Sequence, residues 1–182
     1  ARVRGQGARA VLVCVYGNRA YEDTLAELQD TATEAGFAVA AAVAAVAEHS
    51  ILRQYAAGRP DAQDKAVLEG FAAQIAQKLA QGDTSLPAIP GSRPYKKWGG
   101  SKLAPAAGAG CTGCGLCAQN CPVQAIPQAN PSRTDAAKCI CCMRCVALCP
   151  QKARGLGSLL TAGLAAKLKK ACAVRKECEL YL

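Results

Sequence analysis

The second half of the chain is organised around two short stretches, CTGCGLCAQNCP at residues 111–122 and CICCMRCVALCP at residues 139–150. Each stretch has three cysteines with two residues between them, then a fourth cysteine after three further residues, followed by proline. Eight of the twelve cysteines of the chain occupy these positions. The repeated spacing predicts two copies of one metal-binding loop, and it decides the local fold because the cysteines of each loop must converge.

The spacing fits a cubane iron–sulfur cluster better than a single metal ion or a set of disulfides. Three cysteines spaced in this way can curl around three corners of a cube, and a fourth on the following helical turn points away. Structural zinc uses CxxC pairs in sets of four and needs no additional cysteine before proline. Disulfide frameworks suit small secreted chains, whereas this chain alternates predicted strands and helices and does not open with a signal-peptide pattern. We therefore expect a reducing, cytoplasmic compartment.

Residues 110–152 resemble the bacterial-type 2[4Fe–4S] ferredoxins, whose signature is this spacing of cysteines ending in proline. The resemblance implies an α+β ferredoxin-like domain with two [4Fe–4S] clusters. It also implies crossed ligation, in which each motif lends its fourth cysteine to the other cluster. One cluster is then bound by Cys111, Cys114, Cys117 and Cys149, and the other by Cys139, Cys142, Cys145 and Cys121.

The four remaining cysteines and the single histidine are weaker signals. Cys141 lies inside the second motif but out of register, so we expect a spectator rather than an alternative ligand. Cys14 lies in a predicted buried strand and is expected to act as a small hydrophobic residue. The roles of Cys172 and Cys178 stay open, and His49 is expected to be structural rather than a proton donor or acceptor.

The first half of the chain alternates predicted strands and helices. Residues 11–16 and 37–46 are continuous apolar runs, as expected of strands buried on both faces. Residues 20–35 and 62–81 have apolar residues at helical spacing, and the second helix follows a turn at residues 58–61. This order, with helices of crossover length, predicts an α/β fold with a parallel sheet.

The loop after the first predicted strand resembles the flavin-facing loop of flavodoxins. The flavodoxin pattern Gly-Asp-x-x-Tyr stands here as Gly17-Asn18-Arg19-Ala20-Tyr21. With the turn at residues 58–61 and the Arg175-Lys176-Glu177 tail, the whole chain is similar to the fused flavodoxin–ferredoxin family of anaerobic bacteria and archaea. The resemblance implies that Gly17, Asn18 and Tyr21 contact a flavin, with Tyr16 at the end of the strand as a further candidate. A plain Tyr-Gly-Asn turn is the alternative.

Two departures from the flavodoxin pattern limit flavin binding. The phosphate of FMN needs backbone amides at a helix N-terminus, and the Ser/Thr-Gly-Thr loop that supplies them in flavodoxins is absent from these residues. Asn18 also stands where flavodoxins have an acid. We therefore expect FMN only in a longer parent chain.

The domain organisation follows from these patterns. Two strands do not make a stable doubly wound sheet, so residues 1–82 are expected to be the C-terminal part of a flavodoxin-like domain in a longer protein. A short domain that packs against the cluster domain is the alternative.

The rest of the chain divides into three parts. Residues 83–109, rich in proline and glycine, are predicted to be a linker, and residues 110–152 the ferredoxin domain. Residues 153–182 are predicted to form a basic helix, over 158–173, and a tail. Such a helix packs across a neighbouring domain or lies on a membrane surface.

The charge of the chain is unevenly distributed. Residues 1–82 carry 8 basic and 9 acidic side chains, whereas residues 83–182 carry 14 basic and 4 acidic ones. Each oxidised [4Fe–4S] core with four thiolates carries about −2, so two clusters offset only part of this excess. The remaining positive charge forms either a solvated face or a docking face for an acidic redox partner protein, and we expect no nucleic-acid partner.

No transmembrane segment is expected, because the longest apolar run has 11 residues against the roughly 20 that cross a bilayer.

These patterns predict an electron carrier or electron-transfer module that relays single electrons through two [4Fe–4S] clusters, in a full-length protein to or from a flavin. No nucleophile with its base and no acid–base pair is readable in the sequence, so enzymatic activity is not established. One alternative is the iron–sulfur portion of a flavin-dependent reductase, an oxidoreductase. Another is a non-redox interaction module stabilised by metal. The sequence leaves the oligomeric state open.

Overall fold

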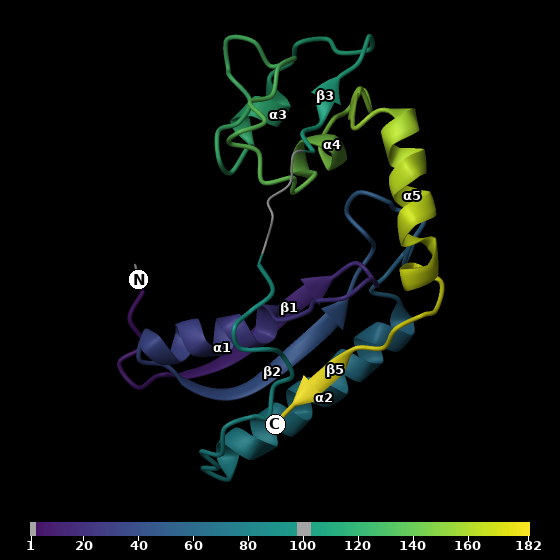
Figure 1. Cartoon of the computed structure of the whole chain (residues 1–182). Coiled ribbons are helices and arrows are strands. Elements are labelled where there is room, and N and C mark those ends of the chain that lie inside the picture. The colour runs from purple at the N-terminus through teal and green to yellow at the C-terminus, as the bar shows by residue number, and fades with distance from the viewer. Residues whose placement is uncertain (1–2, 98–102) are drawn as a thin grey trace. The chain divides into compact units, whose positions relative to one another are not determined.

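The structure, a computed structural model, describes residues 3–97 and 103–182, which fall into two compact units (Figure 1). The first unit takes in the described residues up to His49, Arg53–Lys97 and Leu168–Leu182. The second takes in Ser50–Leu52 and the described residues up to Lys167. The two units are described separately below.

A parallel strand pair forms the centre of the first unit. Strand β1 (Arg9–Tyr16) pairs in parallel with β2 (Ala38–Val46), and helix α1 (Thr24–Glu34) connects them. Helix α2 (Ala62–Ala80) follows β2. These four elements confirm the predicted order of strands and helices, with boundaries that differ by a few residues. The prediction worked because long apolar runs and helical spacing are strong local signals.

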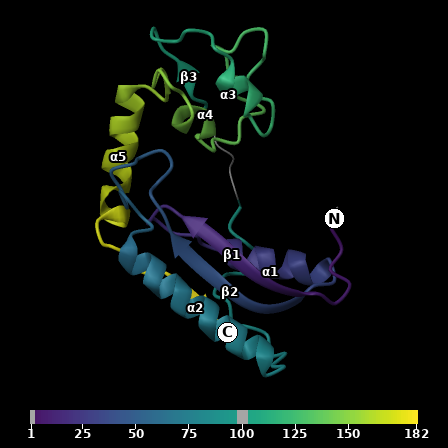
Figure 2. The same cartoon turned by 180° about the vertical axis from the view of Figure 1, so that it is seen from behind.

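Strand β2 is buried at every position after Ala38. Helix α1 packs against both strands and α2 packs against β2, and views from front and back place the two helices on opposite faces of the sheet (Figures 1 and 2). A strand covered on both faces by helices has no solvent-facing side, which explains why β2 is apolar throughout. Alanine dominates the strand, so the helices approach it closely.

The prediction of a parallel sheet holds for β1 and β2 but not for the third strand of the sheet. The chain returns to the first unit at its C-terminal end, where β5 (Glu179–Tyr181) pairs antiparallel with β2 and sets Leu180 opposite Val43. The sheet therefore has three strands in the order β1-β2-β5. Three residues are too few for a sequence pattern to predict a strand. The pairing of β5 also depends on β2, which lies more than a hundred positions earlier in the chain.

The expectation that residues 11–16 form a strand buried on both faces is wrong, because β1 is an edge strand of this sheet with one exposed face. Leu12, Cys14 and Tyr16 point into the core, whereas Val11, Val13 and Val15 alternate with them and are 40%, 54% and 64% exposed. A row of valines on an edge strand is unusual for a surface in contact with water.

The first turn of α2 begins at the predicted turn and is capped from both sides. The backbone N–H of Asp64 donates to the Asp61 carboxylate at 3.0 Å, and the backbone N–H of Asp61 donates to the Asp64 carboxylate at 2.9 Å. This reciprocal capping box satisfies two amides that the helix itself leaves unpaired. The helix therefore starts at Ala62, as the sequence predicts.

Residues 83–97 have no regular secondary structure but are held along α1. Arg93 forms an ion pair with Asp30 at 2.7 Å, and the backbone N–H groups of Ser92 and Lys96 donate to Asp23, each at 2.7 Å. These bonds, with burial opposing them, lower the pKa of Asp30 to about 2 and that of Asp23 below its usual range. Of the predicted linker 83–109, residues 98–102 lie outside the described residues.

The second unit consists mainly of loops around two short helices. A two-stranded antiparallel sheet joins β3 (Ala106–Ala107) to β4 (Arg154–Gly155) and so connects the beginning and end of the cysteine-rich region. Helix α3 (Leu116–Gln119) follows the first three-cysteine loop and α4 (Arg144–Ala147) follows the second. Helix α5 (Ser158–Cys172) confirms the predicted basic helix. Among the described residues, no helix combines the length and apolarity needed to cross a bilayer.

Candidate metal centres

The two cysteine motifs adopt the same backbone conformation. In the first motif Gly113 and Gly115 have φ values of 69° and 77°, and at the equivalent positions of the second motif Cys141 and Met143 have 55° and 57°. The left-handed region is strained for residues other than glycine, so two such residues in one loop show that the loop geometry overrides local preference. The second loop therefore reproduces the first although its sequence lacks the glycines.

The first motif and the end of the second line one cavity, which we call cavity A. Cys111, Cys114, Cys117 and Cys149 all contribute to its wall, together with Pro131 and Arg154. It encloses about 330 Å³, counting the space open to solvent. The four cysteines are the set that the ferredoxin resemblance assigns to one cluster.

The second motif and the end of the first line a separate cavity, which we call cavity B. Cys139, Cys142, Cys145 and Cys121 contribute to its wall, together with Ile126 and Met143. Cavity B encloses about 350 Å³ on the same measure, close to the size of cavity A. Each cavity thus takes three cysteines from one motif and the fourth from the other.

Backbone amides point at the fourth cysteine of each motif. The N–H of Ala125 donates to Cys121 Sγ at 3.2 Å, and the N–H of Ala153 donates to Cys149 Sγ at 3.3 Å. Donation from Ala153 is the main cause that lowers the pKa of Cys149. Such donors favour the thiolate, which is the form that binds metal. Burial has the opposite effect on Cys145 and raises its pKa, against the nearby charge of Arg154.

The donor set fits an iron–sulfur cluster in both cavities. Four thiolates are the ligands that a [4Fe–4S] cluster takes, one for each iron. In the part of the chain that the structure describes, no three His, Cys, Asp or Glu side chains are grouped to hold a single metal ion. The two findings are compatible, because a single zinc ion requires all its sulfurs about 2.3 Å away, whereas a cubane spreads them over four irons.

Sequence reasoning missed a charged residue in the wall of cavity A. Arg154 is only 4% exposed, and its guanidinium donates to Cys117 Sγ at 3.7 Å and to the carbonyl oxygen of Pro131 at 2.6 Å. The sequence does single out this arginine when the two motifs are aligned. The first motif continues as CPVQAI and the second as CPQKAR, so Arg154 stands at the position that Ile126 has in the other motif.

The other cysteines lie away from the cavity walls. Cys141 is not among the residues that line cavity A or cavity B, in agreement with the spectator role predicted for it. Cys14 is buried in β1, and burial raises its pKa, as expected of a small core residue. Cys172 is buried at the end of α5, and Cys178 accepts the backbone N–H of Val46 at 3.4 Å.

His49 lies in the loop that follows β2, where its ring contacts that of Tyr55 edge-on and burial lowers its pKa. The backbone of Gly17 approaches His49 so closely that a Cβ on residue 17 would lie 2.7 Å from the His49 Cα. This packing supports a structural role for the histidine.

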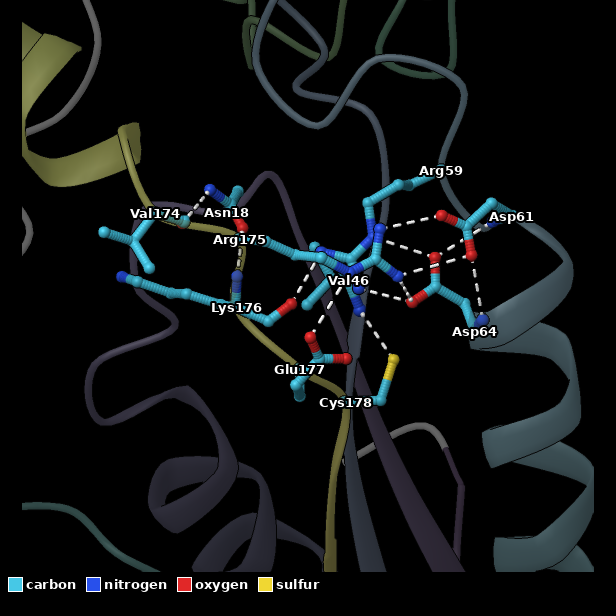
Figure 3. Close-up of polar contacts among 10 residues, drawn as sticks. All are labelled: Asn18, Val46, Arg59, Asp61, Asp64, Val174, Arg175, Lys176, Glu177 and Cys178. Carbon is cyan, nitrogen blue, oxygen red and sulfur yellow. Dashed lines mark hydrogen bonds and ion pairs between the residues drawn. The ribbon is translucent and has the colours of Figure 1, made fainter.

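The flavin-contact candidates lie at the carboxyl end of β1, where the side chains of Asn18 and Tyr21 bond to the C-terminal tail. Asn18 is 3% exposed, and its amide donates to the carbonyl oxygens of Cys172 and Val174, at 3.2 and 2.9 Å. It also accepts the backbone N–H of Lys176 at 2.9 Å (Figure 3). An aspartate could not donate to two carbonyl groups, so this position needs the amide.

The two tyrosines of this loop contact one another and β5. The Tyr16 and Tyr21 rings meet edge-on with centroids 5.2 Å apart, and the hydroxyl group of Tyr21 is hydrogen-bonded to the Tyr181 hydroxyl and the Glu179 carboxylate. Burial raises the pKa of Tyr16 to about 12, and burial together with the Glu179 hydrogen bond raises the pKa of Tyr21. With the amide of Asn18 and the hydroxyl of Tyr21 committed to the tail, the described residues do not form a site that fits FMN.

Further ion pairs fix the tail to the turn before α2 (Figure 3). Arg59 and Asp64 form a buried pair, with the Arg59 Nε 2.8 Å from the carboxylate, and Arg59 also donates to the carbonyl oxygen of Lys176 at 2.6 Å. Arg175 reaches Asp61 at 2.7 Å and Asp64 at 3.0 Å. These pairs lower the pKa of both carboxyl groups, Asp61 chiefly through Arg175 and Asp64 chiefly through Arg59.

The two cavities and their eight cysteines fit a ferredoxin-like iron–sulfur domain. Comparison with protein families agrees, because residues 106–161 match the family of 4Fe-4S dicluster domains. The match covers both cysteine motifs and leaves residues 1–105 and 162–182 outside it. Searches among curated proteins and among solved structures found no match to the chain.

Proposed function

We propose that this chain relays single electrons through two [4Fe–4S] clusters, one in cavity A and one in cavity B. The observation that carries the proposal is the crossed set of cysteines, four in each cavity wall. The match to 4Fe-4S dicluster domains supports the cluster type. When bound, such clusters take up and release one electron each.

The cysteines hold the clusters, and the surrounding backbone stabilises the thiolates. The amides of Ala125 and Ala153 donate to sulfur in equivalent positions, one in each half of the duplicated segment. Hydrogen bonds to sulfur and solvent exposure are among the factors that set the reduction potential of a cluster. Cys114 and Cys142 are exposed, so each cavity has an open side toward solvent.

Anaerobic reconstitution of the full chain, followed by iron, zinc and acid-labile sulfide analysis, tests the proposal. Two cubane clusters contain about eight irons and eight sulfides per chain, and they give a paramagnetic spectrum when reduced. We expect both results. Zinc without labile sulfide would instead favour the non-redox interaction module and end the electron-transfer proposal.

We further propose that residues 1–82 belong to a larger flavodoxin-like domain, and that FMN binds only in a longer parent chain. The contacts proposed there are backbone groups of Gly17 and Asn18 and the ring faces of Tyr16 and Tyr21, because the Asn18 amide and the Tyr21 hydroxyl are already bound to the C-terminal tail. The exposed valines of β1 and its edge position support this proposal, because a neighbouring strand and helix would cover them. Substrate turnover by such a longer protein, lost in Tyr21→Ala with the clusters intact, would favour the flavin-dependent reductase. Electron relay without turnover favours the carrier.

We also propose the domain boundaries set out above, with the cluster domain at residues 110–152, and a reducing cytoplasmic compartment in which free thiolates persist. The partner we propose is a redox protein with an acidic docking face, in keeping with the basic excess of residues 83–182.

A further inference from the structure

The two cavities differ in the residues that they present to solvent. We call the exposed residues that line a cavity its mouth. Mouth A consists of Thr112, Gly113, Cys114, Leu116, Pro150 and Gln151, and mouth B consists of Pro122, Ile140, Cys142 and Arg144. Mouth A therefore has no charged side chain, whereas mouth B has one, the guanidinium of Arg144.

This difference is a departure from the internal duplication of the cysteine motifs. When the motifs are aligned on their cysteines, Arg144 corresponds to Leu116 and Ile140 corresponds to Thr112. Ile140 is 52% exposed. Mouth B thus combines an exposed apolar side chain with an arginine, and arginine is enriched where proteins contact one another.

The charge of Arg144 is not neutralised within the chain. Within residues 3–97 and 103–182, no carboxylate forms an ion pair with it. Asp135 is the only acidic residue between Asp83 and Glu177, and its carboxylate accepts the backbone N–H of Ala137 at 2.9 Å. A carboxylate that pairs with Arg144 therefore has to come from another molecule.

The other arginine of the cavities, Arg154, does not distinguish the two mouths. It is 4% exposed, and it contacts the walls of both cavities. Its guanidinium donates to Cys117 Sγ in the wall of cavity A and to the carbonyl oxygen of Pro105 in the wall of cavity B. A buried charge that both walls share leaves Arg144 as the charge that separates the mouths.

The clusters of the proposed function make this single exposed charge important. A [4Fe–4S] cluster with four thiolates carries about −2 when oxidised and one more negative charge when reduced. An acidic surface that approaches mouth A meets only uncharged side chains in front of that negative site and is repelled. At mouth B the guanidinium of Arg144 offsets part of the repulsion and attracts a carboxylate.

We propose that mouth B is the docking surface for a redox protein whose contact surface is acidic. Arg144 pairs with a carboxylate of this partner, and Ile140 supplies the apolar contact. The inference rests on the proposed function and assigns its acidic partner to one of the two cavities. In the complex one electron passes between the site in cavity B and the redox centre of the partner, so that one is oxidised and the other reduced. No bond forms or breaks and no proton moves.

Stopped-flow electron transfer from the reduced, reconstituted full chain to an acidic flavodoxin tests the docking surface. We expect Arg144→Gln to lower the bimolecular rate constant about threefold or more at low ionic strength, and Arg144→Lys to keep most of it. The rate constants of wild type and Arg144→Gln should converge at high ionic strength, because salt screens the interaction. Equal rate constants at low ionic strength overturn the proposal.

Lys152→Gln is the matched control for charge. Lys152 is exposed and lines neither cavity, and its backbone N–H donates at 3.0 Å to the carbonyl oxygen of Cys149, a cysteine of cavity A. Both variants lose one positive charge, so they differ only in where it is lost. We expect the smaller effect in Lys152→Gln. An equal or larger loss of rate there overturns the proposal, because net charge or mouth A would then govern docking.

A neutral small-molecule acceptor separates docking from a change in the cluster itself. It should oxidise wild type and Arg144→Gln at the same rate. A defect that appears equally with this acceptor and persists at high ionic strength lies in the cluster and overturns the docking proposal.

Ile140→Glu provides a second variant, because it places a negative charge at mouth B and leaves Arg144 in place. It should slow transfer to flavodoxin at low ionic strength at least as much as Arg144→Gln, and it decides the question if Arg144→Gln does not retain iron. An unchanged rate constant in Ile140→Glu overturns the proposal. A wild-type chain without labile sulfide refutes the proposed function itself, a result separate from any rate of docking.

Discussion

At the scale of single residues, eight cysteines determine what the two cavities can bind. The eight motif cysteines can be identified in the sequence because metal ligation demands fixed residue types at fixed spacing. In the structure, four of them line cavity A and the other four line cavity B. Arg154 escaped notice because its position is defined only by comparison with Ile126 in the other half of the duplication. The partners of Asn18 escaped notice because they lie more than 150 positions along the chain.

Crossed ligation predicts that a single cysteine substitution affects the site of the opposite motif. We expect Cys121→Ser to perturb the spectrum of the cluster otherwise bound by Cys139, Cys142 and Cys145, because Cys121 lines cavity B. Cys149→Ser is the matched change for cavity A. Electron paramagnetic resonance of the reduced variants measures both. If each change instead perturbed the cluster of its own motif, the crossed assignment would be wrong.

The buried amide of Asn18 gives a second prediction at this scale. Asn18→Asp replaces two donated hydrogen bonds by a carboxylate facing two carbonyl oxygens, and leaving a buried polar group unsatisfied costs about 1–3 kcal/mol, more for a charged one. We expect the free energy of unfolding of the first unit to fall by about that amount, measured by hydrogen exchange of the β1 and β5 peptides. The control is Arg19→Gln, which changes the next residue but leaves the hydrogen bonds of the Asn18 side chain in place. Equal protection in Asn18→Asp and wild type would contradict the role given to the amide.

At the scale of helices and strands, local patterns predicted β1, α1, β2, α2 and α5, whereas β5 could not be predicted. Each of these five predicted elements has apolar periodicity or capping residues within its own sequence. Strand β5 has three residues, and its pairing with Ala42–Ala44 of β2 depends on the ion pairs and hydrogen bonds that dock the preceding tail. Tertiary contacts, rather than local preference, decide such a strand.

The acidic pair at the start of α2 predicts a dependence of stability on pH. The pKa of Asp64 is lowered in the folded state, chiefly by Arg59, so its contribution to stability is complete above the unfolded value of about 3.9. That contribution is lost as the pH falls below about 4 towards the lowered folded pKa. Breaking a buried pair by removing one partner costs about 3–5 kcal/mol. We therefore expect Asp64→Asn to destabilise the first unit strongly at neutral pH and much less in acid.

Hydrogen exchange of the β2 and β5 peptides, compared between wild type and Asp64→Asn at each pH, measures this difference, and the intrinsic exchange rate cancels in the comparison. Glu69→Gln, an exposed carboxylate on the same helix, serves as the control and should show no such dependence. A stability difference that persisted unchanged at low pH would argue against the ion pair as its source.

At the scale of the whole molecule, the family match and the excess of basic charge both fall on the half of the chain that holds the cysteine motifs. The match to 4Fe-4S dicluster domains covers residues 106–161, whereas the flavodoxin-like interpretation of residues 1–82 rests on the short loop that begins at Gly17 and on the strand order. The core of the first unit is built largely from the small side chains of the Ala-rich strand β2. Charge is concentrated in the half that holds the cysteines.

This charge asymmetry predicts salt-dependent electron transfer. Residues 83–182 have 14 basic and 4 acidic side chains, and two oxidised clusters would reduce the net charge of +10 to about +6. With an acidic partner such as a flavodoxin-type protein, we expect the bimolecular rate constant to fall about tenfold or more from low to high ionic strength. Stopped-flow reduction measures the rate, and a neutral small-molecule acceptor is the control. A rate that did not change with salt would exclude an electrostatic docking face.

The pairing of β5 with β2 has a consequence for the fate of the chain in solution. The sequence of β2, AVAAAVAAV, contains no charge and no proline, and such a segment with an uncovered edge is a template for cross-β stacking. The last few residues of the chain cover that edge along Ala42, Val43 and Ala44. Loss of residues 179–181 would therefore do more than remove three residues, since it would open a route to fibrils that their pairing with β2 keeps closed.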